Sequence, residues 1–191
     1  MRSCCDYNMT TAKTGSFYLT ETITLPAGTD SGTAVQGEID LSAYVNVPTG
    51  QAVAIEMVDF IFQRASLYTS DVESMVAGNG SIDAQLTDLN PGTKFVRADD
   101  QSLVASASLN IDKTNCIASV GSDFYPDNHG PAALSEAFLV VNDSLFLNSL
   151  PAGTAIGTND VYVTAKIKCR VVKLSTKDWM AIAIQSTASD N

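Results

Sequence analysis

The chain has 191 residues, of which 45% are apolar, and it carries 11 Lys and Arg against 21 Asp and Glu, for a formal net charge of −10. The length suits a single domain with its own core. The longest apolar run, residues 53–62, is interrupted by carboxylates and falls well short of the ~20 residues that a membrane-spanning helix needs. We therefore expect a soluble protein, and the lack of a basic tract disfavours binding to nucleic acid or to an anionic membrane surface.

The first residues contain no apolar segment of the kind found in secretory signals, so we expect no signal peptide in this numbering. N-x-S/T acceptors are then interpreted as chance matches in a chain rich in Asn, Ser and Thr; they lie at Asn8, Asn79 and Asn142. The cysteines are too few and too scattered for a disulfide framework; they are Cys4, Cys5, Cys116 and Cys169. We predict free thiols in a reducing compartment, with Cys169 as a small core residue.

The first half of the chain is dominated by strand patterns. Residues 1–15 are expected to form a flexible N-terminal arm. Residues 16–25 alternate apolar side chains with Thr and Glu, which predicts a half-buried strand, and a second such run covers residues 34–45. Residues 51–63 become apolar on both faces towards their end, as a central strand tends to be.

The middle of the chain is less regular. Residues 69–77 predict a short helix, capped by Ser70 or Thr69 and stopped by the Gly-Asn-Gly at 78–80. The segment 125–131, with two prolines and a glycine, is expected to be a loop. Further alternating runs predict strands over residues 82–89, 103–111, 117–124, 136–147 and 160–174.

A helix is the preferred interpretation of the segment that follows Ser175. Ser175 can act as its N-cap, and Asp178 lies three residues further on, a variant of the capping box. Trp179, Ile182 and Ala183 would then share one face. An alternating strand is the rival interpretation. Together these patterns give about eight strands and one or two short helices, which predicts an all-β protein: one antiparallel sandwich or barrel domain over residues 16–191.

The frame LPAGTxxGT occurs twice, at residues 25–33 and 150–158. In each copy Pro is suited to the second position of a β-turn and Gly to the fourth, so we predict that both copies are turns at strand ends. A duplicated domain would also match in the flanking residues, which differ. A catalytic or phosphate-binding loop would need more Gly, a Lys, or a nucleophile beside a base.

No residue pattern indicates a reaction centre. The only histidine, His129, has no nucleophile signature such as G-x-S-x-G around it and no C-x-x-C or H-x-x-H element for zinc. Asp123, Asp127 and Asn128 offer oxygen ligands and are candidates for binding calcium, but their spacing is not that of an EF-hand loop, and Asp and Asn also form turns. We expect no enzyme activity, no cofactor and no small-molecule substrate.

One carboxylate lies inside an apolar run. Asp59 shares its predicted face with Val53 and Ile61, so we expect it to be buried and therefore paired, for example with Arg170. Lys166, which alternates with apolar residues near Arg170, is expected on the solvent-facing side of the last strand. The role predicted for Asp59 is structural, because a lone carboxylate makes no acid–base pair.

Three runs carry a resemblance to a known family: residues 39–46, 51–62 and 161–175. Their pattern resembles the small jelly-roll capsid proteins of viruses, above all the single upright jelly rolls of tailless, membrane-containing double-stranded DNA viruses of archaea and bacteria. The resemblance implies an eight-stranded jelly-roll sandwich that has no active site. It also implies a coat subunit that assembles with copies of itself, and often with a second coat protein, into an icosahedral shell in the host cytoplasm.

The N-terminal arm departs from coats that package RNA by charge, because residues 1–15 hold only Arg2 and Lys13 as basic residues. This favours a shell that touches an internal viral membrane or neighbouring subunits, with no direct nucleic acid binding. Two alternatives remain: a phage fibre or spike, and a carbohydrate-binding β-sandwich. The latter would present exposed aromatic residues; Tyr68 and Tyr125 are the main loop candidates, with Trp179 placed in the predicted helix.

Overall fold

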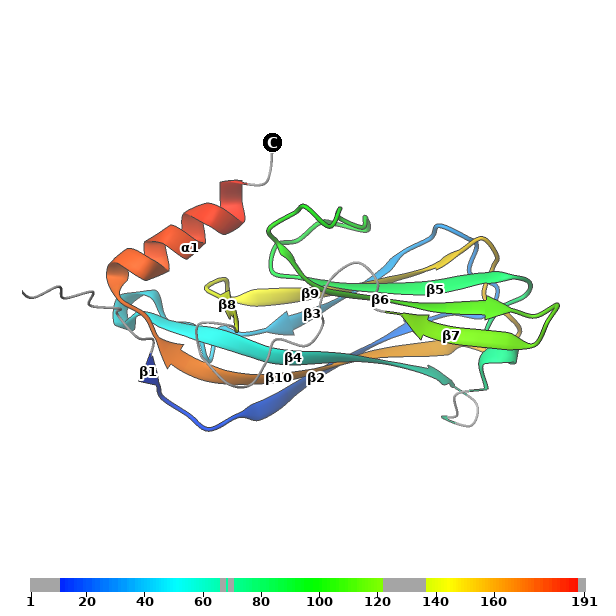
Figure 1. Ribbon diagram of the computed structural model, residues 1–191, viewed down its shortest axis with the longest axis horizontal. Coiled ribbons are helices and arrows are strands. Elements are labelled where there is room, and N and C mark those ends of the chain that lie inside the picture. The colour runs from blue at the N-terminus through cyan, green and yellow to red at the C-terminus, as the bar shows by residue number, and fades with distance from the viewer. Residues whose placement is uncertain (1–10, 66–67, 69–70, 122–136, 189–191) are drawn as a thin grey trace, which may run out of the picture.

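Figure 1 shows a computed structural model of the chain as an elongated sandwich of two β-sheets with a helix at one end. Residues 11–65, 68, 71–121 and 137–188 are described. In these residues the strands are β1 (Thr11–Ala12), β2 (Phe17–Leu25), β3 (Val35–Asp40), β4 (Gln51–Arg64), β5 (Gly80–Thr87), β6 (Leu103–Asp112), β7 (Ile117–Gly121), β8 (Phe138–Val140), β9 (Ser144–Ala152) and β10 (Val161–Lys173). The helices are the 3-10 turns η1 (Val47–Thr49) and η2 (Val72–Ser74) and the α-helix α1 (Thr176–Ala188).

The order of the strands defines the fold. The first sheet runs β2–β10–β4–β8, with β1 also paired to β10, and the second sheet runs β3–β9–β5–β6–β7. The antiparallel pairs β2–β10, β3–β9, β4–β8 and β5–β6 are nested one within the next along the chain. Eight strands in two sheets with this nested pairing form a jelly roll. The prediction of an all-β antiparallel sandwich is confirmed. The described strands number ten because β1 was not predicted and the strand predicted over residues 136–147 is two strands, β8 and β9.

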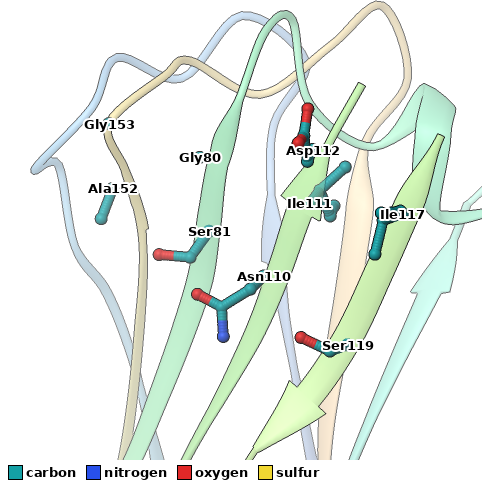
Figure 2. A pocket seen from close by; sticks show the side chains of 9 residues that line it. All are labelled: Gly80, Ser81, Asn110, Ile111, Asp112, Ile117, Ser119, Ala152 and Gly153. Atoms are coloured by element: carbon teal, nitrogen blue, oxygen red, sulfur yellow. The ribbon is translucent and has the colours of Figure 1, made fainter. Parts of the chain in front are cut away.

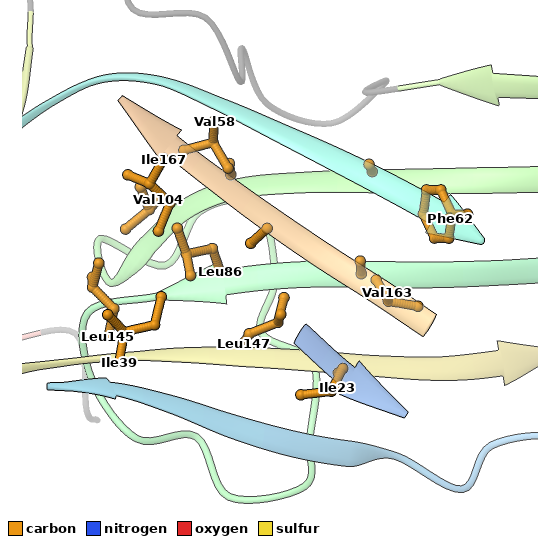
Figure 3. Close-up of a cluster of buried hydrophobic side chains, with 14 of the residues drawn as sticks. Ile23, Ile39, Val58, Phe62, Leu86, Val104, Leu145, Leu147, Val163 and Ile167 are labelled. Atoms are coloured by element: carbon orange, nitrogen blue, oxygen red, sulfur yellow. The ribbon is translucent and has the colours of Figure 1, made fainter. Parts of the chain in front are cut away.

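The core lies between the inward faces of the two sheets (Figure 3): Ile23, Val163 and Ile167 come from the first sheet, and Leu86, Leu145 and Leu147 from the second. Along β10 every second residue is buried, as its alternation predicts; these residues are Val161, Val163, Ala165, Ile167, Cys169 and Val171. Cys169 is fully buried and free, and burial raises the pKa of its thiol to about 12. It is a core residue, as predicted.

The C-terminal helix is confirmed. The Ser175 hydroxyl accepts a hydrogen bond from the Asp178 amide at 3.2 Å and donates one to the Asp178 carboxylate at 2.6 Å, which is the predicted capping interaction. Trp179, Ile182 and Ala183 form the buried side of α1. They pack on a second apolar cluster at the outer face of the first sheet: Ala52, Ala54, Val141, Val172 and Leu174.

Two predicted strands were wrong in their extent. The strand expected over residues 136–147 is two strands in opposite sheets, β8 and β9, because the chain turns at residues 141–143. Buried residues continue across this turn at Val140, Val141 and Leu145, so the apolar pattern hides it. The strand expected over residues 34–45 ends at Asp40, where Leu41 begins a turn.

The predicted helix over residues 69–77 is reduced to η2 in its described part, and its expected caps, Thr69 and Ser70, lie outside the described residues. The strand expected over residues 117–124 is described only as β7. Residues 122–136, which include the whole predicted loop at 125–131 and the candidate calcium ligands, lie outside the described residues.

The two LPAGT frames connect β2 to β3 and β9 to β10, and they lie side by side at one end of the sandwich. Backbone hydrogen bonds join them: Gly28 N to Gly157 O at 3.1 Å, Gly32 N to Pro151 O at 2.7 Å, and Ile156 N to Thr29 O at 2.9 Å. The prediction that both frames form corners is confirmed. Their shared sequence therefore serves one structural feature, a corner built from two loops.

The predicted position of proline within these corners was wrong. In the first copy, the bond from Thr29 N to Pro26 O at 3.1 Å closes the turn, so Pro26 is its first residue and Gly28 its third, with φ 75°. A positive φ at the third position is the conformation that favours glycine. In the second copy Pro151 lies within β9, and Gly153 follows with φ 78°.

Candidate functional site

A hollow of about 470 Å³ lies on the outer face of the second sheet (Figure 2), where β5, β6, β7 and the end of β9 meet. Strand register brings its polar side chains together, because Ser81 pairs with Asn110 and Asn110 pairs with Ser119 across three neighbouring strands. Ile117 borders the hollow on its β7 side. The hollow therefore presents small neutral polar groups next to the sheet's edge strand.

Asp112 is the charged group of this hollow, and it is used by the β6–β7 turn. Its carboxylate accepts hydrogen bonds from the Thr114 amide at 3.0 Å, the Asn115 amide at 3.2 Å and the Asn115 side chain at 2.6 Å. These bonds, above all the one from the Asn115 side chain, hold the pKa of Asp112 below its usual value. Asp112 therefore shapes a turn and is unsuited to act as a general base.

The predicted metal candidates are not tested by the described part of the chain. Asp123, Asp127 and Asn128 lie outside it, as does His129. Within the described ranges, no group of three or more His, Cys, Asp and Glu side chains is placed to hold a metal ion. Calcium binding by residues 123–128 therefore stays a prediction.

Two of the N-x-S/T asparagines are described, and their side chains have structural roles. The side-chain Oδ1 of Asn79 accepts a hydrogen bond from the Lys113 backbone amide at 2.9 Å. The Asn142 side-chain amide donates to the Asp88 backbone carbonyl at 3.0 Å. Asn8 lies outside the described residues. Both described asparagines thus connect loops to neighbouring segments.

The predicted burial of Asp59 was wrong. Asp59 is exposed on the outer face of the first sheet, opposite Lys166 of β10. The cause is a β-bulge: Met57 pairs with Lys168 and Ile55 pairs with Cys169, so Glu56 is an extra residue in β4. The bulge reverses the alternation of β4, and the positions expected to face the core after it face solvent.

Glu56, at the bulge, is, like Asp88 at the start of the β5–β6 loop, a buried carboxylate that the sequence analysis did not single out. Only 3% of its surface is exposed, and its carboxylate forms ion pairs with Arg170 and with Lys168, the latter at 3.5 Å. The Ser16 hydroxyl donates a further hydrogen bond at 3.0 Å. Arg170 therefore does pair with a carboxylate of β4, and Lys166 is exposed as predicted.

The loop between β5 and β6 is held over the outer face of the second sheet by amide side chains. Gln85 of β5 donates to the Val96 carbonyl at 3.0 Å and accepts from the Val96 amide at 2.9 Å. Asn148 of β9 and Gln36 of β3 both donate to the Gly92 carbonyl, at 3.0 and 2.8 Å. Three strands of the sheet thus position one loop.

Among the described residues, Val47 of η1 is exposed alone, and the other exposed large apolar side chains form three groups. One is β7, the second is the side of α1 that faces away from the sheet, and the third is the outer face of the first sheet with its neighbouring loop. These residues are Ile117 and Val120, Met180 and Ile184, and Tyr18, Ile61 and Tyr68. Figure 1 places α1 and β7 towards opposite ends of the long axis.

The outer face of the first sheet combines tyrosines and threonines. Tyr68 stacks on Tyr162 with ring centroids 6.0 Å apart, and the ammonium group of Lys166 lies 5.0 Å from the centre of the Tyr18 ring. Between these pairs, threonines of β2 and β10 lie opposite each other, as Thr22 and Thr164 do.

Among the described helices, none is long and apolar enough to cross a membrane.

Comparison with known proteins adds the following. No protein-family model matches the chain, and no curated protein sequence matches it. Among solved structures, the chain is similar to the unassembled pentamer of Merkel cell polyomavirus VP1, with 11% identity over 85% of this chain and 99% of that one, at a TM-score of 0.38. It is also similar to Desmodium yellow mottle tymovirus, with 7% identity over 92% of each chain at a TM-score of 0.25. The assignment of the jelly roll rests on the strand order described above.

Proposed function

We propose that the chain is a structural virion protein, a coat subunit that assembles with copies of itself into an icosahedral shell. Jelly rolls occur in viral coats, lectins and cupins, so the fold by itself does not select among these. One observation supports the coat over the others. The exposed apolar side chains are distributed over two opposite ends and one face of the molecule.

This distribution matters because exposed apolar groups mark contact surfaces. A module that binds one ligand needs one such surface, usually a concave one. A subunit of a closed shell needs several, because it contacts different neighbours on different sides. The group on α1, with Met180 and Ile184 one helical turn apart, and the group on β7, with Ile117 and Val120, would serve two different neighbours.

We extend the proposal to the other components of the virion. A second coat protein in the capsomer and an internal membrane under the shell are its proposed partners, and no direct contact with nucleic acid is proposed. For two of the four basic residues of β10 this last point has support, because Arg170 and Lys168 already pair with Glu56. Strong, salt-sensitive binding of the purified subunit to DNA or RNA would contradict it.

Electron microscopy and sedimentation of the purified chain over a range of protein and salt concentrations test the proposal. We expect rings or closed shells that grow with concentration. The double variant Met180→Ser/Ile184→Ser should lose them, while Thr20→Ser, on the exposed face of β2, should assemble normally. A chain that stays monomeric under all conditions would overturn the proposal, and a stable trimer without shells would favour a fibre or spike.

Carbohydrate binding is a second candidate, favoured by the stacked pair of Tyr68 and Tyr162. Tyr68 is 68% exposed, and a flat aromatic face in this position can stack on a sugar ring. A glycan array with the purified chain tests this function. Binding that is retained in a monomeric chain and lost in Tyr68→Ala would support it, and equal binding of the variant would exclude this site.

A further inference from the structure

β7 is an addition to the eight strands of the jelly roll, and it lies at the edge of the second sheet. It pairs with β6 on one side, and no described strand pairs with its other side. Val120 pairs with Leu109, which is 2% exposed, yet Val120 itself is 65% exposed. The core therefore ends at β6, and the apolar side chains of β7 are left in solvent.

The free edge of β7 lacks the features that protect an edge strand. Natural sheets prevent edge-to-edge pairing with charged residues, proline or bulges. The sequence of β7, IASVG, has no charge and no proline, and its pairing with β6 has no shift of register. The other long edge strands differ, since β2 carries Glu21 and β3 carries Glu38 and Asp40.

The difference in charge between β7 and the other edge strands indicates a second copy of the chain as the partner of β7. A chain with 21 acidic and 11 basic residues repels its own copies, so two copies can approach most closely where strand edges carry no carboxylate. Among β2, β3 and β7, that edge is β7. A second copy of the same strand brings an edge that is equally uncharged, and a symmetric contact of this kind forms a closed two-fold pair.

We propose that β7 pairs with β7 of a second copy, in antiparallel register about Ser119. In this register Ala118 lies opposite Val120 of the second copy, and Ile117 lies opposite Gly121, so each large side chain meets a small one. The hollow of Figure 2 adjoins the same strand, with Ser119 and Ile117 at its border. It leaves space on the outer face for the side chains that a second β7 would bring. The second sheets of two copies would then form one continuous sheet.

The inference rests on the proposed function, since it names one of the contacts from which a shell would be built. Five paired residues bury less surface than a stable free dimer requires, so the contact is expected to be weak in solution. Repetition over a shell would strengthen it through multivalency. A method that traps weak contacts is therefore the suitable test.

Disulfide trapping tests the register directly. In a background in which Cys4, Cys5 and Cys116 are changed to Ser, Ser119→Cys places two thiols opposite each other at a distance that a disulfide spans. Ala118→Cys is the control within the strand, because its two Cα atoms would be about 8 Å apart, beyond that reach. Thr20→Cys, exposed on the edge strand β2, is the control for random collision.

We expect covalent dimers under mild oxidation from Ser119→Cys, at least tenfold more than from either control. Equal yields from all three variants, or none from Ser119→Cys, would overturn the inference. If shells form in microscopy while Ser119→Cys gives no dimers, the inference fails and the proposed function stands. If Ser119→Cys crosslinks and no shell forms under any condition, the contact stands and the proposed function fails.

A charge placed on the edge gives a second readout. Val120→Lys should weaken self-association in sedimentation at least tenfold, because it places two positive charges as diagonal neighbours on one face of a short interface. Thr20→Lys, with the same change of charge on the edge of β2, should leave association unchanged. Circular dichroism and a melting curve confirm that both variants are folded, and equal association of the two variants would contradict the inference.

Discussion

Glu56 and Arg170 form an ion pair on the outer face of the first sheet, at the bulge where β4 and β10 change register. The Glu56 carboxylate is 3% exposed, whereas 24% of the Arg170 side chain is exposed. A buried carboxylate without its partner is costly, because the protein interior solvates its charge poorly. Arg170 therefore stabilises the bulge, because it compensates the charge of the buried Glu56 carboxylate that water cannot solvate.

We predict that Arg170→Met lowers the free energy of unfolding by about 2–3 kcal/mol, because it removes the main counter-charge of Glu56 and keeps the length of the side chain. Lys166→Met, on the same face of β10 but exposed, should cost less than about 1 kcal/mol. Urea denaturation measures both values. The double variant Arg170→Met/Glu56→Gln should recover part of the loss, and no recovery would contradict this explanation.

The same bulge explains why sequence reasoning failed at Asp59. Strict alternation from Val53 onwards places Asp59 in the core, and nothing in the residues of β4 marks the extra position at Glu56. The capped helix after Ser175 was predictable, because its signals are local. Bulges and free edges depend on partners that are far away in the sequence, so alternation alone does not reveal them.

Gly32 and Gly157 occupy the same place in the two LPAGTxxGT frames, and they differ in what an alanine would meet. At Gly157 an added Cβ would lie 2.5 Å from the Ser74 carbonyl oxygen, a backbone atom that cannot move aside cheaply. At Gly32, with φ 83°, nothing lies within 4 Å, and only the backbone conformation is unfavourable. Glycine is therefore required for different reasons in the two frames: close packing at Gly157 and a positive φ at Gly32.

We therefore predict that Gly157→Ala lowers the free energy of unfolding by about 3 kcal/mol, as overpacking does, and Gly32→Ala by about 1 kcal/mol. Thermal denaturation of the two variants side by side checks the ranking. Equal losses would mean that the close approach between Gly157 and Ser74 relaxes without cost.

The repeat also shows how far the sequence could predict the corners. Turn chemistry correctly placed both frames at the ends of strands, but the three backbone bonds between the two frames were not predictable, because they depend on strand order. The division of residues 136–147 into β8 and β9 escaped for a similar reason. Val140 and Val141 are both buried, in different clusters, so the hydrophobic pattern is continuous where the chain changes sheet.

Asp88, at the start of the β5–β6 loop, should make stability depend on pH. It is 2% exposed, and burial, together with the charge of Asp100, raises its pKa from 3.8 to about 7. The folded state therefore binds the proton more tightly than the unfolded state, so this group's contribution to stability is full below about pH 4 and is lost as the pH rises to about 7. The loss corresponds to about 4 kcal/mol at most.

Asp88→Asn removes this titration while it keeps the shape of the side chain. We expect the variant to be more stable than the parent chain at pH 8 and equal to it near pH 4. Asp99→Asn, in the same loop but exposed, should follow the parent chain at both pH values. Denaturant unfolding at the two pH values measures the differences, and a parent chain whose stability rises from pH 5 to pH 7 as Asp88 ionises would contradict the assignment.

Gln85 should control the opening of the loop that it holds. Both of its side-chain hydrogen bonds go to Val96, so Gln85→Ala leaves the Val96 amide and carbonyl without that partner, and local opening should become easier by about 1–2 kcal/mol. Lys94 and Arg97 are exposed in this loop and offer sites for trypsin. Because cleavage follows the population of the open form, we expect it to be about 5- to 30-fold faster in the variant. Asn110→Ala, an exposed position on β6, should be cleaved like the parent chain, and an unchanged rate in Gln85→Ala would mean that Asn148 and Gln36 suffice to hold the loop.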